Sequence, residues 1–196
     1  MYTESLCEAL IWARNKELLG DNVIELGGNE WHGKLNGYCK SRVKNWMISE
    51  SLTMLYRNLG VSDFKQFPRK PKLKTQFDTV VAKDFVDSGF DIPNLFREVH
   101  DLTKPGGCMI INSAVGISSA MVSMTPNAVA FLAKKNAYDI PMYRIETPTR
   151  TFSVQFNSGN LYNTAELRDL LYKFRETHNL RLSVCIKKTS NDEFKY

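Results

Sequence analysis

The sequence has few of the residues from which metal sites and disulfide frameworks are built. Its four cysteines and three histidines are scattered along 196 residues and form no C-x-x-C pair. We therefore expect neither a metal centre nor a disulfide framework, and we favour a reducing compartment. The residues concerned are Cys7, Cys39, Cys108, Cys185, His32, His100 and His178.

Long hydrophobic runs are also missing. None approaches the ~20 apolar residues of a membrane-spanning helix, and Glu4 and Glu8 make the N-terminus unlike a signal peptide. These absences predict a cytoplasmic protein without membrane contact. The length favours a single domain over 1–196. A content of 43% hydrophobic and 24% charged residues is typical of a soluble globular chain with its own core.

The net charge of +5 is mild, but basic residues concentrate in the segment 65–74. Clustered lysines and arginines raise the local affinity for phosphate, so a weak nucleic-acid contact through this segment is one interpretation. The other, which we favour, is a solvated loop, because Pro68 and Pro71 prevent regular strand pairing there.

Short apolar runs alternate with helical patterns in the first two thirds of the chain. The alternation of strand, helix and strand with short turns is the βαβ pattern of a parallel sheet covered by helices. The sequence predicts helices over 4–19, 49–59 and 91–102, and buried strands over 22–28, 77–82 and 108–111.

The last third of the chain changes character. In its final strand, leucine, valine and isoleucine alternate with polar or small residues, which predicts one wet face near an antiparallel edge that is open to pairing. The predicted fold class is therefore α/β, an open Rossmann-like sheet that is parallel at its centre with antiparallel strands at one edge. The elements predicted here are helices over 125–136 and 163–174 and strands over 140–146, 151–156 and 180–187.

In open α/β sheets, ligands bind outside the carboxyl ends of the parallel strands. Three loops qualify, namely those after Leu26, Val81 and Ile111. The first begins with Gly27-Gly28-Asn29, and glycine lets a ligand approach the backbone because it has no Cβ. This turn matches neither the dinucleotide fingerprint nor the phosphate loop, so it indicates no pyrophosphate or triphosphate binding.

Several stretches resemble motifs of class I S-adenosylmethionine-dependent methyltransferases. Val23-Ile24-Glu25-Leu26-Gly27-Gly28-Asn29 resembles the first motif of that family, and Phe77-Asp78-Thr79-Val80-Val81 is similar to its fourth strand. The stretch 94–111, with Lys104-Pro105-Gly106-Gly107, resembles the helix, turn and fifth strand. Two later stretches, 126–138 and 186–194, resemble a bacterial and phage subgroup. The resemblance implies the class I methyltransferase fold.

The resemblance also implies a cofactor, S-adenosylmethionine, with S-adenosylhomocysteine as product. A carboxylate at the end of the first strand would face the positively charged amino-acid end of the cofactor. The glycine turn after it would line the methionine and ribose portions, and the residues after the fourth strand would lie near the transferred methyl group. The implied cofactor-binding residues are Glu25, Gly27, Gly28, Asn29, Ala82, Lys83 and Asp84.

Two elements of the family pattern are not found where we expect them. Members usually carry an acid at the end of the second strand to hold the ribose hydroxyls, but in the stretch 61–70 after Gly60 the only acid is Asp63, which comes too early. The subgroup's acid–histidine dipeptide is replaced by 85–89. No catalytic residue and no oligomeric state follow from the sequence. Two functions remain open: a methyltransferase acting on an unidentified small-molecule, sugar or macromolecular acceptor, and a catalytically degenerate relative that serves as a binding or assembly module.

Overall fold

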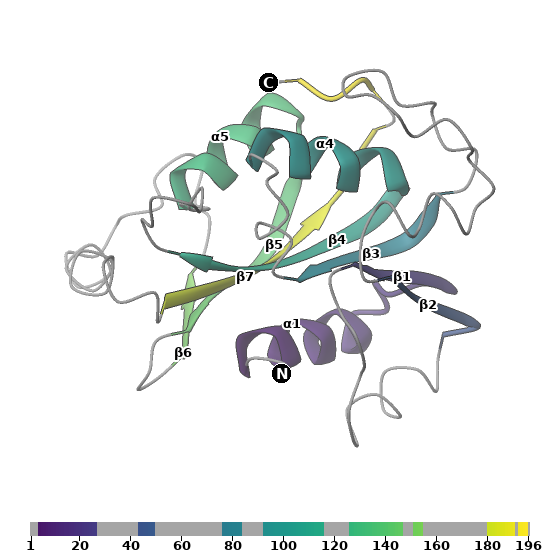
Figure 1. Ribbon diagram of the computed structural model, residues 1–196, viewed down its shortest axis with the longest axis horizontal. Helices are drawn as coiled ribbons and strands as arrows, with labels where there is room; N and C mark the ends of the chain where they lie inside the picture. Colours follow the sequence, from purple (N-terminus) through teal and green to yellow (C-terminus); the bar gives the residue numbers. More distant parts are fainter. Residues whose placement is uncertain are drawn as a thin grey trace.

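The computed structural model describes residues 4–26, 43–49, 76–83, 92–115, 126–146, 151–154, 180–190 and 192–195, which form a mixed sheet with helices on both faces (Figure 1). The helices are α1 (Glu4–Asn15), α4 (Ile92–Leu102) and α5 (Pro126–Lys135). The strands are β1 (Asn22–Leu26), β2 (Asn45–Ser49), β3 (Phe77–Lys83), β4 (Thr103–Val115), β5 (Asp139–Glu146), β6 (Thr151–Val154) and β7 (Leu180–Lys187).

The described strands form one sheet of seven in the order β2-β1-β3-β4-β7-β5-β6. Strands β1 to β4 are parallel to one another, whereas β7 is antiparallel to both β4 and β5, and β6 is antiparallel to β5. Strand β5 therefore runs in the same direction as β1 to β4. The predicted α/β fold, a Rossmann-like sheet that is parallel at its centre with antiparallel strands towards one edge, is confirmed.

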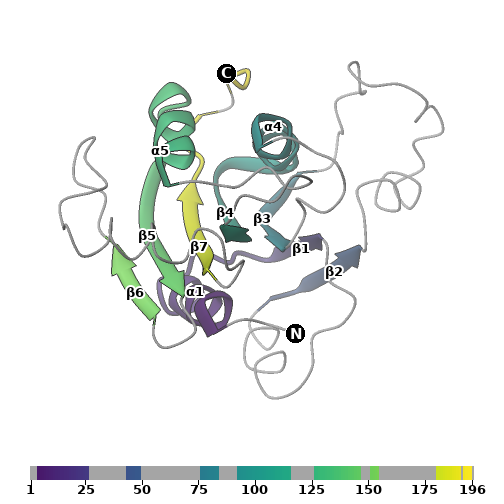
Figure 2. The ribbon, with the colours of Figure 1, turned by 60° about the vertical axis from the view of Figure 1, so that its left-hand side comes forward.

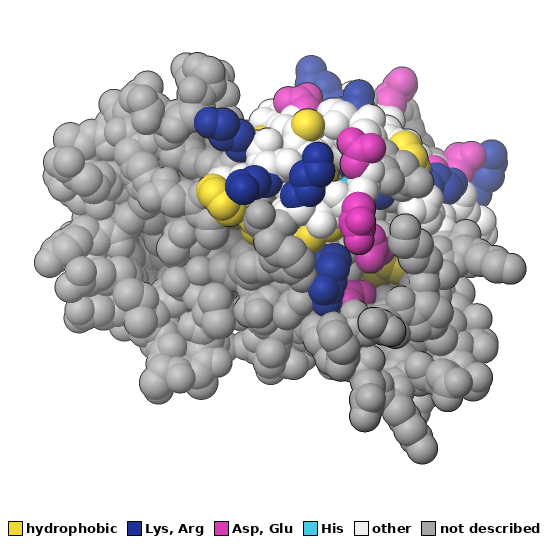
Figure 3. All heavy atoms as spheres, turned by 90° about the horizontal axis from the view of Figure 1, so that it is seen from above, with side chains coloured by type: hydrophobic (Ala, Val, Ile, Leu, Met, Phe, Trp, Pro, Cys, Tyr) yellow, Lys and Arg dark blue, Asp and Glu magenta, His cyan; other side chains and the backbone are white. Residues whose placement is uncertain are grey.

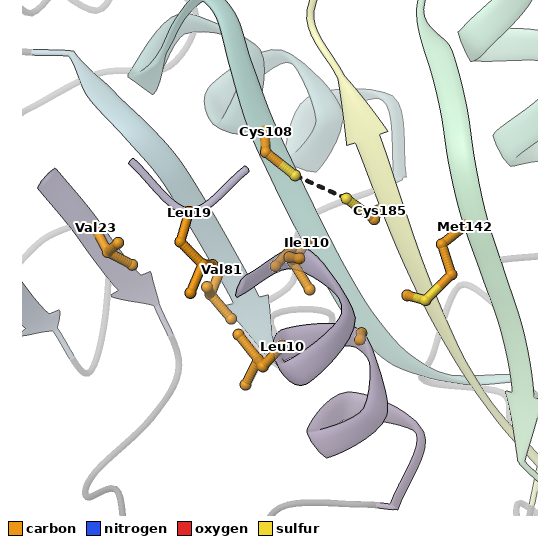
Figure 4. Packing of buried hydrophobic residues seen from close by; sticks show 10 residues of the cluster. Leu10, Leu19, Val23, Val81, Cys108, Ile110, Met142 and Cys185 are labelled. Carbon is orange, nitrogen blue, oxygen red and sulfur yellow. Dashed lines mark hydrogen bonds between the residues drawn. The ribbon is translucent and has the colours of Figure 1, made fainter. Parts of the chain in front are cut away.

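Helix α1 covers one face of the sheet, and α4 and α5 cover the other (Figures 1 and 2). In α1, Ala9, Leu10 and Ala13 are fully buried, because positions three and four apart share one face of a helix. They pack on Val81 and Ile110 of the sheet, as Figure 4 shows for Leu10. Full burial of a leucine side chain stabilises a fold by roughly 1.5–3 kcal/mol.

On the opposite face, α4 and α5 bury apolar side chains against the sheet. Phe96, Val99 and Leu102 of α4 are fully buried, and Val129 and Leu132 of α5 are buried as well. The outer surface over these helices carries lysine, arginine, aspartate and glutamate side chains interspersed, with few hydrophobic ones among its described residues (Figure 3). Among the described residues, no helix combines the length and apolar character needed to cross a membrane.

Two helix predictions differ from the structure. The first helix was predicted to reach residue 19 but ends at Asn15, because Glu17 adopts a left-handed conformation (φ 58°) and the Leu18 amide donates to the Ala13 carbonyl at 2.8 Å. This is the hydrogen bond of a Schellman cap, with glutamate where glycine is usual. The helix predicted from residue 49 is wrong at its start, since residue 49 ends β2. The remainder of that helix, and the one predicted over 163–174, lie outside the described residues.

The prediction for the last strand is right in its bounds and wrong in its place. Strand β7 lies between β4 and β5 in the interior of the sheet, so it offers no pairing edge. Its central residues are buried on both faces, including Ser183 and Cys185, which the alternating pattern had assigned to a wet face. The Ser183 hydroxyl accepts a hydrogen bond from Asn112, and the Cys185 thiol contacts Cys108, so both small side chains have polar partners inside the fold.

Candidate functional site

Strands β1, β3 and β4 reach the same edge of the sheet side by side. Leu26 lies beside Ala82, and Ala82 lies beside Ile111. One position further along, Lys83 at the end of β3 lies beside Asn112 of β4. Two of the three loops selected from the sequence therefore start from adjacent positions at the carboxyl edge, where open α/β sheets bind ligands.

Glu25 supplies a buried carboxyl group just below this edge. It lies beside Val81 of β3 and Ile48 of β2, and it is fully buried. The indole Nε1 of Trp46 donates a hydrogen bond to its Oε2 at 3.4 Å. Burial of a carboxylate is costly unless polar or charged partners compensate it, so this position selects for positive or hydrogen-bonding groups. Sequence analysis missed Trp46, because the strand that carries it was not predicted.

The structure brings together part of the residue set predicted from the sequence. Glu25 and Ala82 are both buried at the carboxyl edge, and Lys83 is the last residue of β3. The rest of the set lies outside the described residues, and their roles stay predictions: Gly27, Gly28, Asn29 and Asp84.

The position of strand β2 changes which residue is expected to bind the ribose hydroxyls. The second strand was expected to lie near Gly60, but the strand that pairs in parallel with β1 is Asn45–Ser49. The residue that follows it in the sequence is Glu50. Glu50 itself lies outside the described residues, yet its position in the chain is the one at which the resemblance implies an acid. The second strand thus ends before Gly60 in the sequence.

A polar network borders the same edge on the α1 face. The Asn112 amide donates to the Ser183 hydroxyl at 2.6 Å and accepts from the Arg181 guanidinium at 2.9 Å. Arg144, which lies beside Ser183, is 3.5 Å from the Glu8 carboxylate of α1. The network fixes β4, β7 and β5 relative to one another next to the candidate site. Its members come from distant parts of the sequence, and no motif signalled them.

The opposite, amino edge of the sheet holds an open cleft of about 420 Å³ lined by Asp78, Lys104 and Gly107, among others. Burial acts to raise the pKa of Asp78, but hydrogen bonds from Lys104 and Asn22 outweigh it and hold this pKa below its usual value. A Cβ on Gly107 would lie 2.7 Å from the Asp78 carbonyl oxygen, and one on Gly20 would lie 2.3 Å from the Asp78 Cβ. Both glycines are thus required by packing.

These contacts explain the Lys104-Pro105-Gly106-Gly107 stretch. It was expected as a turn before the strand, but it forms the irregular start of β4, where the register with β3 shifts. The Lys104 ammonium lies 2.8 Å from the Asp78 carboxylate, and the Gly106 amide donates to the Lys188 carbonyl. The stretch joins strands at the amino edge, away from the candidate site, so its role is structural.

His100 also lies away from the carboxyl edge, at the end of α4. Its Nδ1 is 2.5 Å from the Tyr138 hydroxyl and its Nε2 is 2.8 Å from the Asp192 carbonyl oxygen. A carbonyl only accepts, so Nε2 carries the proton and the Tyr138 hydroxyl donates to Nδ1. Burial, together with the positive charge of Lys188, lowers the pKa of His100 to about 4. The side chain is buried.

Comparison with known proteins places this fold among methyltransferase structures. No family model and no curated protein matches the chain. The N-methyltransferase NodS from Bradyrhizobium japonicum, solved with S-adenosylhomocysteine, matches with a TM-score of 0.54 at 10% identity, covering 94% of this chain and 86% of that one. The YcgJ protein from Bacillus subtilis matches with a TM-score of 0.51 at 14% identity, covering 96% of this chain and 100% of that one.

A third structure, the StiE O-MT, gives a TM-score of 0.50 at 15% identity and covers 97% of this chain and 74% of that one. The described sheet and these similarities together define the α/β Rossmann-like fold of class I methyltransferases. The fold is what such low identities establish, and the bacterial and phage subgroup has no support from them.

Proposed function

We propose that this protein is an S-adenosylmethionine-dependent methyltransferase that binds its cofactor at the carboxyl ends of β1 and β3. The observation that carries the proposal is the buried carboxyl group of Glu25 at the edge where Leu26 and Ala82 lie side by side. It is supported by the fold shared with NodS, which was solved with S-adenosylhomocysteine. A fold alone does not determine function, so the proposal depends on this site.

The residues at this edge fit such a cofactor by charge and by size. Glu25 offers a negative charge to its ammonium group, and Gly27 has no Cβ to obstruct the backbone approach. Glu50, the residue that follows β2 in the sequence, would accept hydrogen bonds from the ribose hydroxyls. When bound, the cofactor supplies a methyl group already activated by the sulfonium charge. The task left to the chain is to align the acceptor, which the resemblance would place near Lys83 and Asp84, and a general base is needed only for a protonated acceptor.

Calorimetric titration with S-adenosylhomocysteine and S-adenosylmethionine tests the proposal. We expect both to bind, and we expect Glu25→Gln to weaken binding by about tenfold or more, because a charged partner is lost. Glu98→Gln is the matched control, since Glu98 is also buried but lies on α4. It should leave the affinity unchanged. Absence of heat with either compound at millimolar concentration would favour the degenerate binding module.

Two further variants locate the site. Gly27→Val should abolish binding in a folded chain, because its side chain would enter the space proposed for the cofactor. Glu50→Ala should weaken binding through the lost ribose contacts. Retained affinity in a folded Gly27→Val variant would place the site elsewhere, and circular dichroism establishes that the variant is folded.

The methyl acceptor of the proposed reaction can be identified by experiment. Mass spectrometry of compounds that copurify with the protein tests for small molecules and sugars. A nucleic-acid acceptor would be approached through 65–74, which lies outside the described residues. Reversing Lys70, Lys72 and Lys74 to glutamate should then abolish salt-sensitive retention of DNA or RNA. Unchanged retention would assign the segment to a solvated loop.

A further inference from the structure

Two cysteines that are far apart in the sequence face each other inside the fold. Cys108 lies in β4 and Cys185 lies in the neighbouring antiparallel strand β7. Their Sγ atoms are 2.8 Å apart, and both thiols are free. Figure 4 shows the two side chains pointing toward one another across the gap between the strands. Buried cysteines usually act as small hydrophobic residues, and this direct contact sets the pair apart.

The backbone around the pair needs little change to join the two sulfurs. Cys185 lies opposite Ile110, and Cys108 lies opposite Lys187, so the cysteines are diagonal neighbours on one face of the sheet. A disulfide has an S–S length of about 2.05 Å, so the sulfurs need to approach by only about 0.8 Å. Long antiparallel pairing of β4 with β7 holds both strands in register.

We propose that Cys108 and Cys185 form an oxidation site at which a peroxide generates an intramolecular disulfide between β4 and β7. This goes beyond the methyltransferase proposal and does not depend on it. The site takes a small oxidant, because α1 covers it with Ala9, Leu10 and Ala13 and both cysteines are at most 1% exposed.

The reaction balances in two steps. One thiol, as its thiolate, attacks a peroxide oxygen. The O–O bond breaks, a sulfenic acid forms on that sulfur and one water leaves. The other sulfur then attacks the sulfenic sulfur, so the S–S bond forms, the S–O bond breaks and a second water leaves. The two sulfurs together lose two electrons, and the two peroxide oxygens gain them.

Burial makes this site slow and its product durable. The hydrogen bond with Cys108, and then burial, raise the pKa of the Cys185 thiol, so thiolate is scarce in the closed fold. Oxidation therefore proceeds through local opening of the structure above the pair. Once formed, the disulfide is shielded from thiol reductants by the same cover. It closes a long loop of the chain, which restricts the unfolded state.

The test uses the full chain with Cys39→Ser, which leaves three cysteines. Cys7 is half-buried, and the fraction of Cys7 that is oxidised serves as an internal measure of exposure to hydrogen peroxide. We expect a peptide containing Cys108 linked to Cys185, a mass loss of two hydrogens, and a rise in melting temperature of roughly 5–10 °C. Denaturation with a reductant should reverse all three changes.

Serine variants provide the controls. Cys108→Ser and Cys185→Ser should each abolish the linked peptide and the rise in melting temperature, whereas Cys7→Ser should retain both. The proposal is overturned if Cys7 is fully oxidised while Cys108 and Cys185 can still both be alkylated after denaturation. It is equally overturned if the linked peptide pairs Cys7 with either of them.

Discussion

His100 is held neutral by its surroundings. The Asp192 carbonyl fixes the proton on Nε2, the Tyr138 hydroxyl donates to Nδ1, and Lys188 places a positive charge nearby. Burial and the Lys188 charge favour the uncharged ring, and they outweigh the Asp192 carbonyl, which by itself favours the imidazolium. A histidine of this kind makes the stability of the fold depend on pH without any role in chemistry.

We predict that stability falls as the pH drops from about 6.5 toward about 4. The pKa of His100 is about 4 in the folded chain and about 6.5 in the unfolded chain, so between these values the unfolded state binds more protons. The loss amounts to at most about 3 kcal/mol. Urea unfolding at several pH values measures it. His100→Gln should remove this part of the slope, and an unchanged slope in that variant would contradict the assignment.

Ala137 adopts a left-handed conformation (φ 52°) just after α5, and Tyr138 closes the cap by donating to the Ala133 carbonyl at 2.9 Å. Residues with a Cβ pay for this conformation, and glycine does not. We predict that Ala137→Gly stabilises the fold by roughly 0.5–1 kcal/mol. The matched change Ala133→Gly, inside the helix, should destabilise it by about 1 kcal/mol or more. Thermal unfolding compares the two, and equal effects would contradict the prediction.

Helix α4 shows how an element is completed by a residue far along the chain. The last carbonyl groups of a helix lack partners within it. The Lys188 ammonium donates to the carbonyls of His100 and Thr103, each at 2.8 Å, and the side chain is 1% exposed. Burial lowers the pKa of Lys188. The positive charge lies at the negative end of the helix dipole.

We predict that Lys188→Met destabilises the fold by about 2–3 kcal/mol, because two carbonyl groups lose their donor. Lys187→Met is the control, since Lys187 is adjacent and exposed, and it should change stability by less than about 0.5 kcal/mol. Denaturant unfolding measures both variants. Similar losses in the two would mean that the ammonium contributes nothing specific.

Elements with their own hydrophobic pattern were predictable, and elements defined by a neighbour were not. The patterns of 77–82, 91–102, 125–136 and 180–187 gave nearly the observed bounds. Strand β2 has five residues with an asparagine and a serine at its ends, and Met47 is 38% exposed, so its pairing with β1 defines it. Missing β2 also misplaced the expected ribose-binding acid.

The residues of the candidate site also fall into two groups: those that a local motif marks and those that contacts between strands define. Glu25 and Ala82 were selected as site residues because local motifs mark them, and the structure places both at the carboxyl edge. Trp46, Asn112 and Arg181 were not found, since their contacts join strands that are distant in sequence and depend on register. The burial of Cys185 beside Cys108 follows from the central place of β7, which its alternating pattern concealed.

On the scale of the whole molecule, the last described residues tie together the helical layer. Lys195 and Asn136 exchange two hydrogen bonds, and the Thr189 hydroxyl donates to the Ala137 carbonyl. The centroid of the Phe194 ring lies 5.8 Å from that of the His100 ring. Phe194 is only 7% exposed although it lies near the end of the chain. The segment joins α4 to α5 over the sheet.

We predict that Phe194→Ala destabilises the molecule by roughly 2–4 kcal/mol, through lost burial and a cavity between α4 and α5. Glu193→Ala, at the exposed neighbouring position, should be nearly neutral. Thermal melts of both variants provide the comparison. A neutral Phe194→Ala would mean that the segment rests on the helices without stabilising them.

The insertion of β7 between β4 and β5 has a consequence for synthesis on the ribosome. Until residues 180–187 emerge, β4 and β5 have no strand between them, and each presents unpaired backbone groups. The nascent chain therefore holds two incomplete half-sheets whose closure awaits residues 180–187. A chaperone that shields strand edges would act on this protein before residues 180–187 emerge, and a ribosome stalled before Leu180 would release a product prone to aggregation.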